Sequence, residues 1–261
     1  MAKSGGSRGA PKRRTGRDAA PRRTGASPAG RSAQRSRTGP PAEKPQERTT
    51  SEPGTFVLGA VPGATPGKWI DVWRERMPHV GLELRTIAVA TQRNELLATP
   101  AEDRDAATRV PPIDAALVRL PIDREGLHVI PLYEELPVVV VSKDSHLTAA
   151  DELDLADLAG EIVIVPADDV LAFEVPGAVA PVFDPPETTA DAIATVATGV
   201  GLVVVPMSLA RLHQRRDVAS IPLREGPMSE VALAWQADRT TPHVETFVGI
   251  VRGRTSNSSR G

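Results

Sequence analysis

The stretch FVLGAVPGATP at residues 56–66 decides the fold, because the chain carries its first apolar run there. Its first six residues are typical of a buried parallel strand, and its closing Thr-Pro pair predicts the N-cap and first residue of a helix. Residues 1–54 contain no Val, Ile, Leu, Phe, Trp or Tyr, so we expect them to be disordered. The folded part is then expected over residues 55–254, with a disordered C-terminus at residues 255–261.

Outward from this stretch, apolar runs alternate with amphipathic segments in the order of an α/β fold. The extended segment at residues 127–141 contains Pro131 and Pro137, which argue for a passage to a second lobe and against a central strand. The last expected strand could rejoin the first lobe. The expected strands are 56–61, 82–89, 113–120, 161–165, 201–206, 221–223 and 231–236. The expected helices are 65–77, 91–97, 148–160, 188–199, 207–215 and one from Thr241 onward, with capping boxes at Thr148 with Asp151 and at Thr188 with Asp191.

The charge is distributed unevenly along the chain. Residues 1–54 carry 13 Lys and Arg against 4 Asp and Glu, a net charge of +9, and the remainder carries −11. The basic clusters could contact the phosphates of DNA or RNA without sequence preference, although no aromatic residue is available for base stacking. The alternative is a passive, solvated tail. The candidate residues for weak nucleic-acid contact are Lys12, Arg13, Arg14, Arg22 and Arg23.

Several classes of protein find no support in the sequence. It has no Cys, which excludes disulfides and thiolate metal sites, and its five histidines show no metal-binding spacing. It has no phosphate loop, dinucleotide fingerprint or nucleophile elbow, so we expect no cofactor and no enzyme. It also lacks a run of about 20 apolar residues and a signal peptide, so we expect a cytoplasmic protein without membrane contact.

Four strings, in the same order along the chain, resemble those of the effector-binding (substrate-binding) domain of LysR-type transcriptional regulators. They are Trp73-Arg-Glu-Arg-Met-Pro78, Ile113-Asp-Ala-Ala-Leu-Val-Arg-Leu-Pro121, Val140-Val-Ser-Lys-Asp-Ser-His-Leu147 and Val196-Ala-Thr-Gly-Val-Gly-Leu-Val-Val-Val-Pro206. The last string is the most specific of the four. The resemblance covers about residues 55–254.

This resemblance implies an α/β fold of two Rossmann-like lobes, similar to type II periplasmic binding proteins. Lobe I would comprise about residues 55–126 and 224–254, and lobe II about residues 127–223. A small-molecule effector would lie in the cleft between the lobes, and the lobes would mediate a homodimer. The family's N-terminal helix-turn-helix has no counterpart in the basic tail, so its sequence-reading DNA contact cannot be carried over to this chain.

Candidate effector-binding residues in the first lobe follow its strands. Gly63, Ala64 and Thr65 follow the first strand, where ligands of open α/β sheets bind and where free N–H groups favour an anion. Thr65 has the alternative role of a helix cap. Val89 occupies a position where the family often has a hydroxyl residue, which predicts a more apolar pocket. Arg119, near the end of the third strand, could bind a carboxylate ligand or form an ion pair with an acidic residue across the lobes.

In the second lobe, Pro166 and Phe173 follow the expected strand at residues 161–165, and the resemblance implies that they line the cleft. The alternative for Phe173 is a place in the hydrophobic core. The adjacent Asp168 and Asp169 are expected to form a solvated turn.

The leading functional hypothesis is therefore a domain that senses a small molecule, possibly a carboxylate, and regulates transcription when the ligand closes the lobes. Two alternatives remain at this stage. One is a solute-binding protein, and the other is an enzyme on the same two-lobed scaffold.

Overall fold

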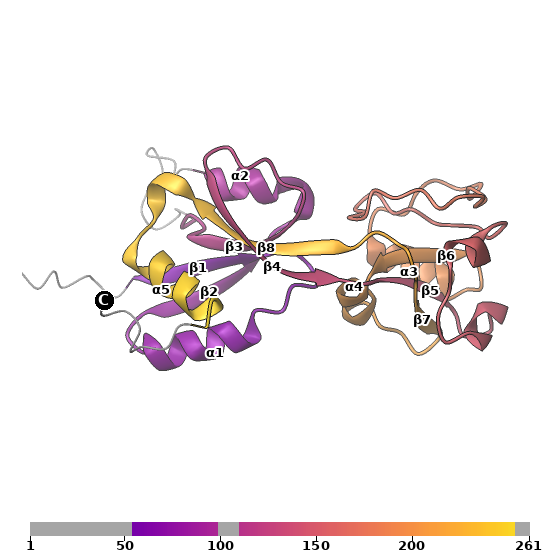
Figure 1. Cartoon of the computed structure of the whole chain (residues 1–261), viewed down its shortest axis with the longest axis horizontal. Coiled ribbons are helices and arrows are strands. Elements are labelled where there is room, and N and C mark those ends of the chain that lie inside the picture. Colours follow the sequence, from indigo (N-terminus) through magenta and orange to yellow (C-terminus); the bar gives the residue numbers. More distant parts are fainter. Residues whose placement is uncertain (1–53, 99–109, 254–261) are drawn as a thin grey trace, which may run out of the picture. The chain divides into compact units, whose positions relative to one another are not determined.

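The computed structural model describes residues 54–98 and 110–253. Two β-sheets organise the described part of the chain (Figure 1). Residues 1–53, which include all five candidate nucleic-acid residues, lie outside it, as do the expected C-terminal residues 255–261. Within the described residues, no helix is long and apolar enough to cross a membrane.

The first sheet has five strands in the order β2-β1-β3-β8-β4. β1 (Thr55–Ala60) pairs in parallel with β2 (Gly81–Thr86) and β3 (Ala115–Arg119), while β8 (Ser229–Gln236) runs antiparallel to β3 and to β4 (Leu127–Glu135). The first three strands and their connections form the β-α-β-α-β unit that the sequence predicted, and β8 returns to this sheet as expected. The helices of this sheet are α1 (Gly67–Arg76), α2 (Gln92–Leu97) and α5 (Pro242–Val251).

Alternating side chains of β1 build the two cores of this sheet. Phe56 packs on the face covered by α1 and α5, where its ring lies 4.6 Å from that of Trp73 and 5.2 Å from that of Phe247. Val57 belongs to a second core together with Leu96 of α2. Helix α2 lies on the side of the sheet opposite α1 and α5 (Figure 1). A strand buried on both faces needs a continuous apolar sequence, and this is why residues 56–61 show no polar alternation.

The second sheet has three antiparallel strands in the order β6-β5-β7. They are β5 (Pro137–Ser142), β6 (Leu202–Pro206) and β7 (Val218–Pro222), accompanied by α3 (Thr189–Val196) and α4 (Met207–Leu212). Thr188 caps α3 as predicted, with its hydroxyl accepting a hydrogen bond from the backbone N–H of Asp191. The apolar run that forms β6 is the end of the most specific string in the sequence.

Two segments connect the sheets. β4 passes into β5 through Leu136, and the chain returns from β7 to β8 through residues 223–228. Residues 127–135, which the sequence analysis assigned to the second lobe, pair with β8 in the first sheet. In the return segment, a Cβ atom on Gly226 would lie 2.7 Å from Cγ of Pro137, so the two connections pack closely against each other.

The secondary structure corrects four predictions. The helix expected at residues 148–160 is absent, because this stretch forms two short 3-10 turns, η2 (His146–Ala149) and η3 (Leu155–Leu158), and the capping box belongs to Asp154 and Asp157. The expected strand at residues 161–165 makes only isolated bridges, at Ile162 and Val163.

Thr65 is not the cap of α1, which is the third correction. Pro66 occupies the N-cap position, no side chain caps this end, and the helix begins at Gly67. Residues 87–89, expected to continue the second strand, leave it after Thr86, and Val89 opens the 3-10 turn η1 (Val89–Thr91). The last two corrections change the predicted backbone around the candidate site, because the loop before α1 and the segment from β2 to η1 both lie next to it.

Candidate functional site

A cleft of about 620 Å³ lies between segments of the two sheets. The first sheet contributes the loop after β1 and residues from β2 to η1, and the second contributes the segment before α3, the start of α3 and one face of α4. The volume falls within the range of small-molecule sites. Its lining is Ala60, Val61, Pro62, Gly63, Ala64, Leu84, Thr86, Ala88, Val89, Ala90, Arg119, Ala167, Asp168, Asp169, Val170, Thr188, Thr189, Ala190, Leu209, Leu212 and His213.

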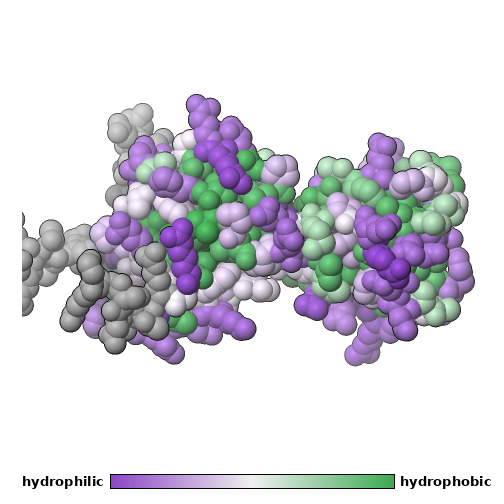
Figure 2. Space-filling model, in the orientation of Figure 1, coloured by the Kyte–Doolittle hydropathy of each residue, from purple (hydrophilic) through white to green (hydrophobic). Residues whose placement is uncertain are grey.

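Most of this lining is apolar. Leu84 and Leu212, which keep 50% and 55% of their surface exposed, both line the cleft. Figure 2 shows hydrophobic side chains that reach the surface among hydrophilic ones over both sheets. With Val89 and Ala90 at the end of this wall, the cleft has the apolar character that the sequence predicted from these positions.

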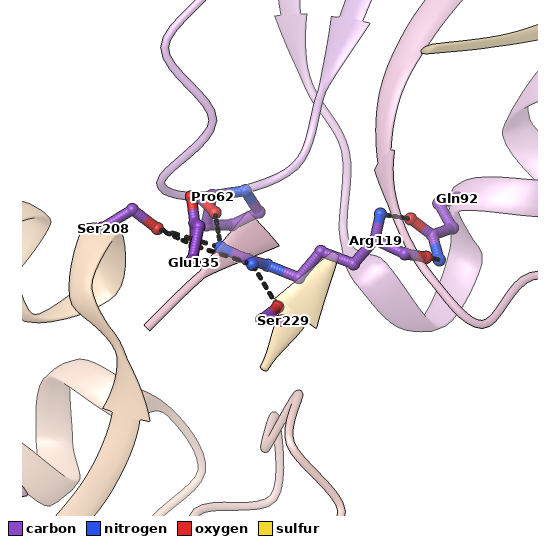
Figure 3. A network of polar contacts seen from close by, with 6 residues as sticks. All are labelled: Pro62, Gln92, Arg119, Glu135, Ser208 and Ser229. Carbon is purple, nitrogen blue, oxygen red and sulfur yellow. Dashed lines mark hydrogen bonds and ion pairs between the residues drawn. The ribbon is translucent and has the colours of Figure 1, made fainter. Parts of the chain in front are cut away.

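Arg119 is fully buried beside the cleft, with 1% of its surface exposed. Its backbone is fixed by Gln92, whose amide accepts from the Arg119 N–H and donates to the Arg119 carbonyl, both at 2.9 Å. Figure 3 shows the side chain running from this anchor to a cluster of polar groups around its guanidinium. This pair of hydrogen bonds holds the backbone of Arg119 at the end of β3.

The guanidinium of Arg119 is already engaged by the protein. Nη1 donates to Oε2 of Glu135 at 2.9 Å and to Oγ of Ser229 at 2.6 Å, and Nη2 donates to Oγ of Ser208 at 3.0 Å and to the Pro62 carbonyl at 3.3 Å. Among the described residues, Nε has no hydrogen-bond partner, and it is itself buried. The structure contains an ion pair of Arg119 with Glu135, but both residues belong to strands of the first sheet, so the pair does not run across the lobes as the sequence analysis expected.

Ser208 joins the two sheets within this cluster. It lies in α4 beside the second sheet, and its hydroxyl accepts from Arg119 and donates to Oε2 of Glu135 at 2.7 Å. Both of these partners belong to strands of the first sheet. Burial strengthens each bond of such a network, and also makes the loss of any one charge costly.

Gly63 makes this junction possible. Its φ of +84° lies in the left-handed region, and a Cβ atom there would stand 2.5 Å from Oγ of Ser208 and 3.2 Å from Nη2 of Arg119. No side chain fits at this distance without moving one of the two. Glycine therefore allows the loop after β1 to meet α4 directly.

The predicted site residues fall into three groups. Gly63, Ala64, Val89 and Arg119 line the cleft together. Thr65 lines a neighbouring depression of about 630 Å³, which shares Gly63 and Ala64 with the cleft.

Pro166 and Phe173 line neither space. They lie around a crevice of about 10 Å³, which is too small for an effector. The chain reaches the cleft at Ala167, one residue after Pro166, and residues 167–170 form this part of its wall.

Sequence reasoning missed the wall contributed by the second sheet, above all Asp168 and Asp169. Oδ1 of Asp168 accepts a hydrogen bond from Oγ1 of Thr189 at 2.8 Å, at the start of α3. The carboxylate of Asp169 accepts from the backbone N–H groups of Leu171 and Ala172. The Asp-Asp pair was visible in the sequence, but its position beside α3 depends on the fold of residues 160–188.

Two ionisable groups in or next to strands of the first sheet have shifted pKa values. Burial raises the pKa of Tyr133, in the depression beside the cleft, and the negative charge of Glu135 raises it further. Burial also raises the pKa of Asp114, although its carboxylate accepts a 2.8 Å hydrogen bond from the backbone N–H of Val57. Among the described residues, no group of three or more His, Cys, Asp or Glu could hold a metal ion.

Comparison with known proteins identifies relatives of this chain. Residues 50–256 match the family described as the LysR substrate binding domain. The chain is 34% identical over 149 residues to the HTH-type transcriptional regulator CatR of Pseudomonas putida, a match that covers 53% of this chain and 51% of CatR. It is 25% identical over 238 residues to the HTH-type transcriptional regulator AlsR of Bacillus subtilis (strain 168), covering 84% of this chain and 74% of AlsR. The chain thus spans about half the length of CatR.

Solved structures share the fold. The oxidised form of OxyR superposes with a TM-score of 0.59 at 19% identity, covering 79% of this chain and 98% of that one. The BenM effector binding domain with its effector benzoate superposes with a TM-score of 0.57 at 19% identity, covering 78% of this chain and 95% of that one. The two-sheet α/β architecture is accordingly the type II periplasmic-binding-protein-like fold that the sequence predicted.

Proposed function

We propose, from the premise that this chain belongs to the family of LysR substrate binding domains, that it binds a small-molecule effector in the cleft lined by Arg119, Val89 and Asp168. The observation that carries this proposal is the cleft itself, because its two walls come from different sheets and its volume suits a small molecule. A ligand that touches both walls favours whichever arrangement of the sheets fits it best.

The expected mechanism is a shift in the population of lobe arrangements. Two connections link the sheets, at Leu136 and at residues 223–228, and such segments absorb the dihedral changes of hinge motions. Ser208 of α4 hydrogen-bonds to Arg119 and Glu135 of the first sheet. A hinge motion between the sheets would either preserve these two hydrogen bonds or break them. The effector would alter a dimer surface through this movement and act on transcription, not catalyse a reaction.

The wider assembly follows from the relatives and stays within the proposal. CatR and AlsR are HTH-type transcriptional regulators by name, and we expect this chain to serve the same kind of process as a homodimer in the cytoplasm. Non-specific DNA contact through the basic tail would add to this function and would weaken steeply as salt concentration rises.

A thermal-shift screen of small metabolites tests the proposal when it is combined with a blocked cleft. Ala90 is exposed on η1 and lines the cleft, so Ala90→Trp fills the cleft without disturbing the core. Ala149→Trp is the matched control, because Ala149 is exposed on another 3-10 turn, η2, and does not line the cleft. Compounds that stabilise the wild type and the control, but not Ala90→Trp, support the proposal. Compounds that stabilise all three proteins equally would place the binding site elsewhere.

A further inference from the structure

We infer that the cleft selects an uncharged, mainly apolar small molecule, and that Leu84 and Leu212 hold this molecule from the two walls. This inference rests on the proposed function and specifies the chemical class of its ligand. It follows from two features of the cleft. Most of its lining is apolar, and its Arg and Asp side chains are hydrogen-bonded within the protein.

Leu84 and Leu212 bring apolar surface from the two sheets to one cleft. Leu84 lies on β2 and Leu212 ends α4, and they keep 50% and 55% of their surface exposed. Val89 and Val170, which are partly buried, extend the apolar surface on the first and second wall. A ligand whose apolar body contacts both leucines removes this surface from water, which favours binding in proportion to the area covered.

Arg119 offers no free charge to an anionic ligand. Both Nη atoms donate to protein acceptors, and Glu135 compensates the charge at 2.9 Å. The Nε–H has no partner among the described residues, but it is buried, and only 1% of the surface of Arg119 is exposed. Because the charge is compensated, this donor does not require an anion, and a neutral oxygen would satisfy it if binding opened a path to it. A carboxylate would lose hydration here without a free cation in exchange.

The start of α3 adds little for an anion. The backbone N–H of Asp191 already donates to the hydroxyl of Thr188. The carboxylate of Asp191 accepts from the same hydroxyl at 2.6 Å, and that of Asp168 accepts from the hydroxyl of Thr189 at 2.8 Å. The N–H groups of a first helical turn attract anions, but an anion here would lie close to two carboxylates, which oppose its binding.

The aspartates of the cleft wall give a cation only weak support. Asp168 is exposed, and an exposed pair of opposite charges contributes little in water. Asp169 already accepts from the backbone N–H groups of Leu171 and Ala172, at 3.1 Å and 2.8 Å. An ammonium group that enters the apolar cleft would lose its hydration for these weak partners, whereas an uncharged molecule has no such hydration to lose.

His213 is the histidine of the lining, at the C-terminal end of α4. A histidine side chain can acquire a positive charge between pH 5 and 8, which would attract an anion but not an uncharged molecule. Binding of an uncharged ligand should therefore change little over this range. Binding of an anion through His213 should instead strengthen as the pH falls, and this difference separates the two ligand classes.

Compounds of similar shape that differ in charge test this inference. The full chain is titrated by calorimetry at about pH 6 and about pH 8 with 2-phenylethanol, phenylacetate and 2-phenylethylamine. A second set replaces the aromatic ring with cyclohexane, because no Phe, Tyr or Trp lines the cleft and ring stacking should not contribute. We expect each alcohol to bind at least about tenfold more tightly than either charged partner at both pH values, which corresponds to about 1.4 kcal/mol.

Leu84→Ala and Leu212→Ala should each weaken binding of the alcohols about fivefold to tenfold, because each removes apolar contact with the ligand. Leu84→Met keeps an apolar side chain of similar volume and should bind like the wild type. Val179→Ala is the control, since Val179 keeps 48% of its surface exposed and does not line the cleft; it should leave the affinity unchanged. All three positions are exposed, so the variants should fold, and their Tm values without ligand verify this.

Each contrary outcome has its own meaning. A charged compound that binds as tightly as its alcohol, and loses binding in Ala90→Trp, overturns the ligand class while the effector site stands. Phenylacetate binding that appears only at the lower pH and is lost in His213→Gln overturns it in favour of an anion bound by His213. Alcohol binding that neither leucine variant weakens overturns the role of Leu84 and Leu212. If no compound binds, the uncharged class is rejected, and the metabolite screen with Ala90→Trp decides separately whether the cleft is an effector site.

Discussion

Replacing Gly63 with Ala tests whether close contact between the loop after β1 and α4 shapes the domain. The added Cβ would lie 2.5 Å from Oγ of Ser208, at a φ of +84°. A left-handed conformation costs a non-glycine residue about 1–2 kcal/mol, and overpacking at a fixed contact costs about 1–3 kcal/mol. We therefore expect Gly63→Ala to lower the free energy of unfolding by about 2–5 kcal/mol.

Urea denaturation followed by the fluorescence of buried Trp73 measures this loss, and Gly67→Ala is the matched control. A Cβ on Gly67, at the start of α1, would meet no atom within 4 Å. This control should be neutral or stabilising by up to about 1 kcal/mol, because alanine reduces the entropy of the unfolded chain.

A double-mutant cycle separates the clash from the backbone strain. Ser208→Ala removes the oxygen nearest to the added Cβ, so the cost of Gly63→Ala should fall in this background to about the backbone contribution of 1–2 kcal/mol. Two results would show that the loop after β1 does not pack tightly against Ser208. One is a loss of unfolding free energy for Gly63→Ala no larger than that for Gly67→Ala. The other is an equal loss with and without the Ser208 hydroxyl.

Three further changes probe the polar network, the buried carboxyl and the connection between the sheets. Glu135→Gln leaves the charge of Arg119 buried without a carboxylate and should lower the free energy of unfolding by about 3 kcal/mol, whereas the exposed neighbour Glu134→Gln should stay within about 0.5 kcal/mol in the same urea titration. Burial raises the pKa of Asp114 above 3.8. The stability contributed by its protonated carboxyl group is therefore complete below this value and is lost as the pH rises through the folded-state pKa. The Tm of Asp114→Asn relative to that of the wild type should rise from acidic to neutral pH, and a constant difference would contradict this. Gly226→Ala places a Cβ 2.7 Å from Pro137 and should lower Tm by several degrees, and a Tm equal to that of Gly67→Ala would count against tight packing of the two connections.

The positions of several strands along the chain could be predicted from the sequence because local signals and burial agree there. Residues 56–61 and 202–206 are continuous apolar runs, which only strands buried on both faces require. The start of α5 was equally clear, since Thr241 accepts a hydrogen bond from Val244 and Pro242 follows it. In each case the residues of one short stretch are enough to predict the element.

Residues 148–165 show where such signals fail. Thr148 and Asp151 have the spacing of a capping box, yet the actual box lies at Asp154 and Asp157 and opens only a 3-10 turn. Leu147, Leu153 and Leu158 each enter the core of the second sheet, and their spacings of six and five residues do not match one stripe of a helix. Packing against the sheet therefore overrides the local preference for a longer helix.

The candidate site was predictable only where it depends on one strand end at a time. Gly63, Ala64 and Arg119 follow β1 or end β3, and the rule that ligands bind beyond strand ends was enough to select them. The partners of Arg119 were not predictable, because Glu135, Ser208 and Ser229 come from three distant parts of the sequence. Whether an arginine offers its charge to a ligand depends on these partners, and no spacing along the chain contains that information.

The same reasoning changes how the cleft should be interpreted. An arginine at the end of β3 and a helix start in the facing wall are both typical anion sites when each is considered alone. In this chain Glu135 occupies the first, whereas at the second Asp168 accepts from the hydroxyl of Thr189 and not from the backbone N–H groups of the helix start. Asp168 lies exposed in a turn, as the sequence analysis expected, and the fold brings this turn to the wall of the cleft, which no spacing along the chain indicates.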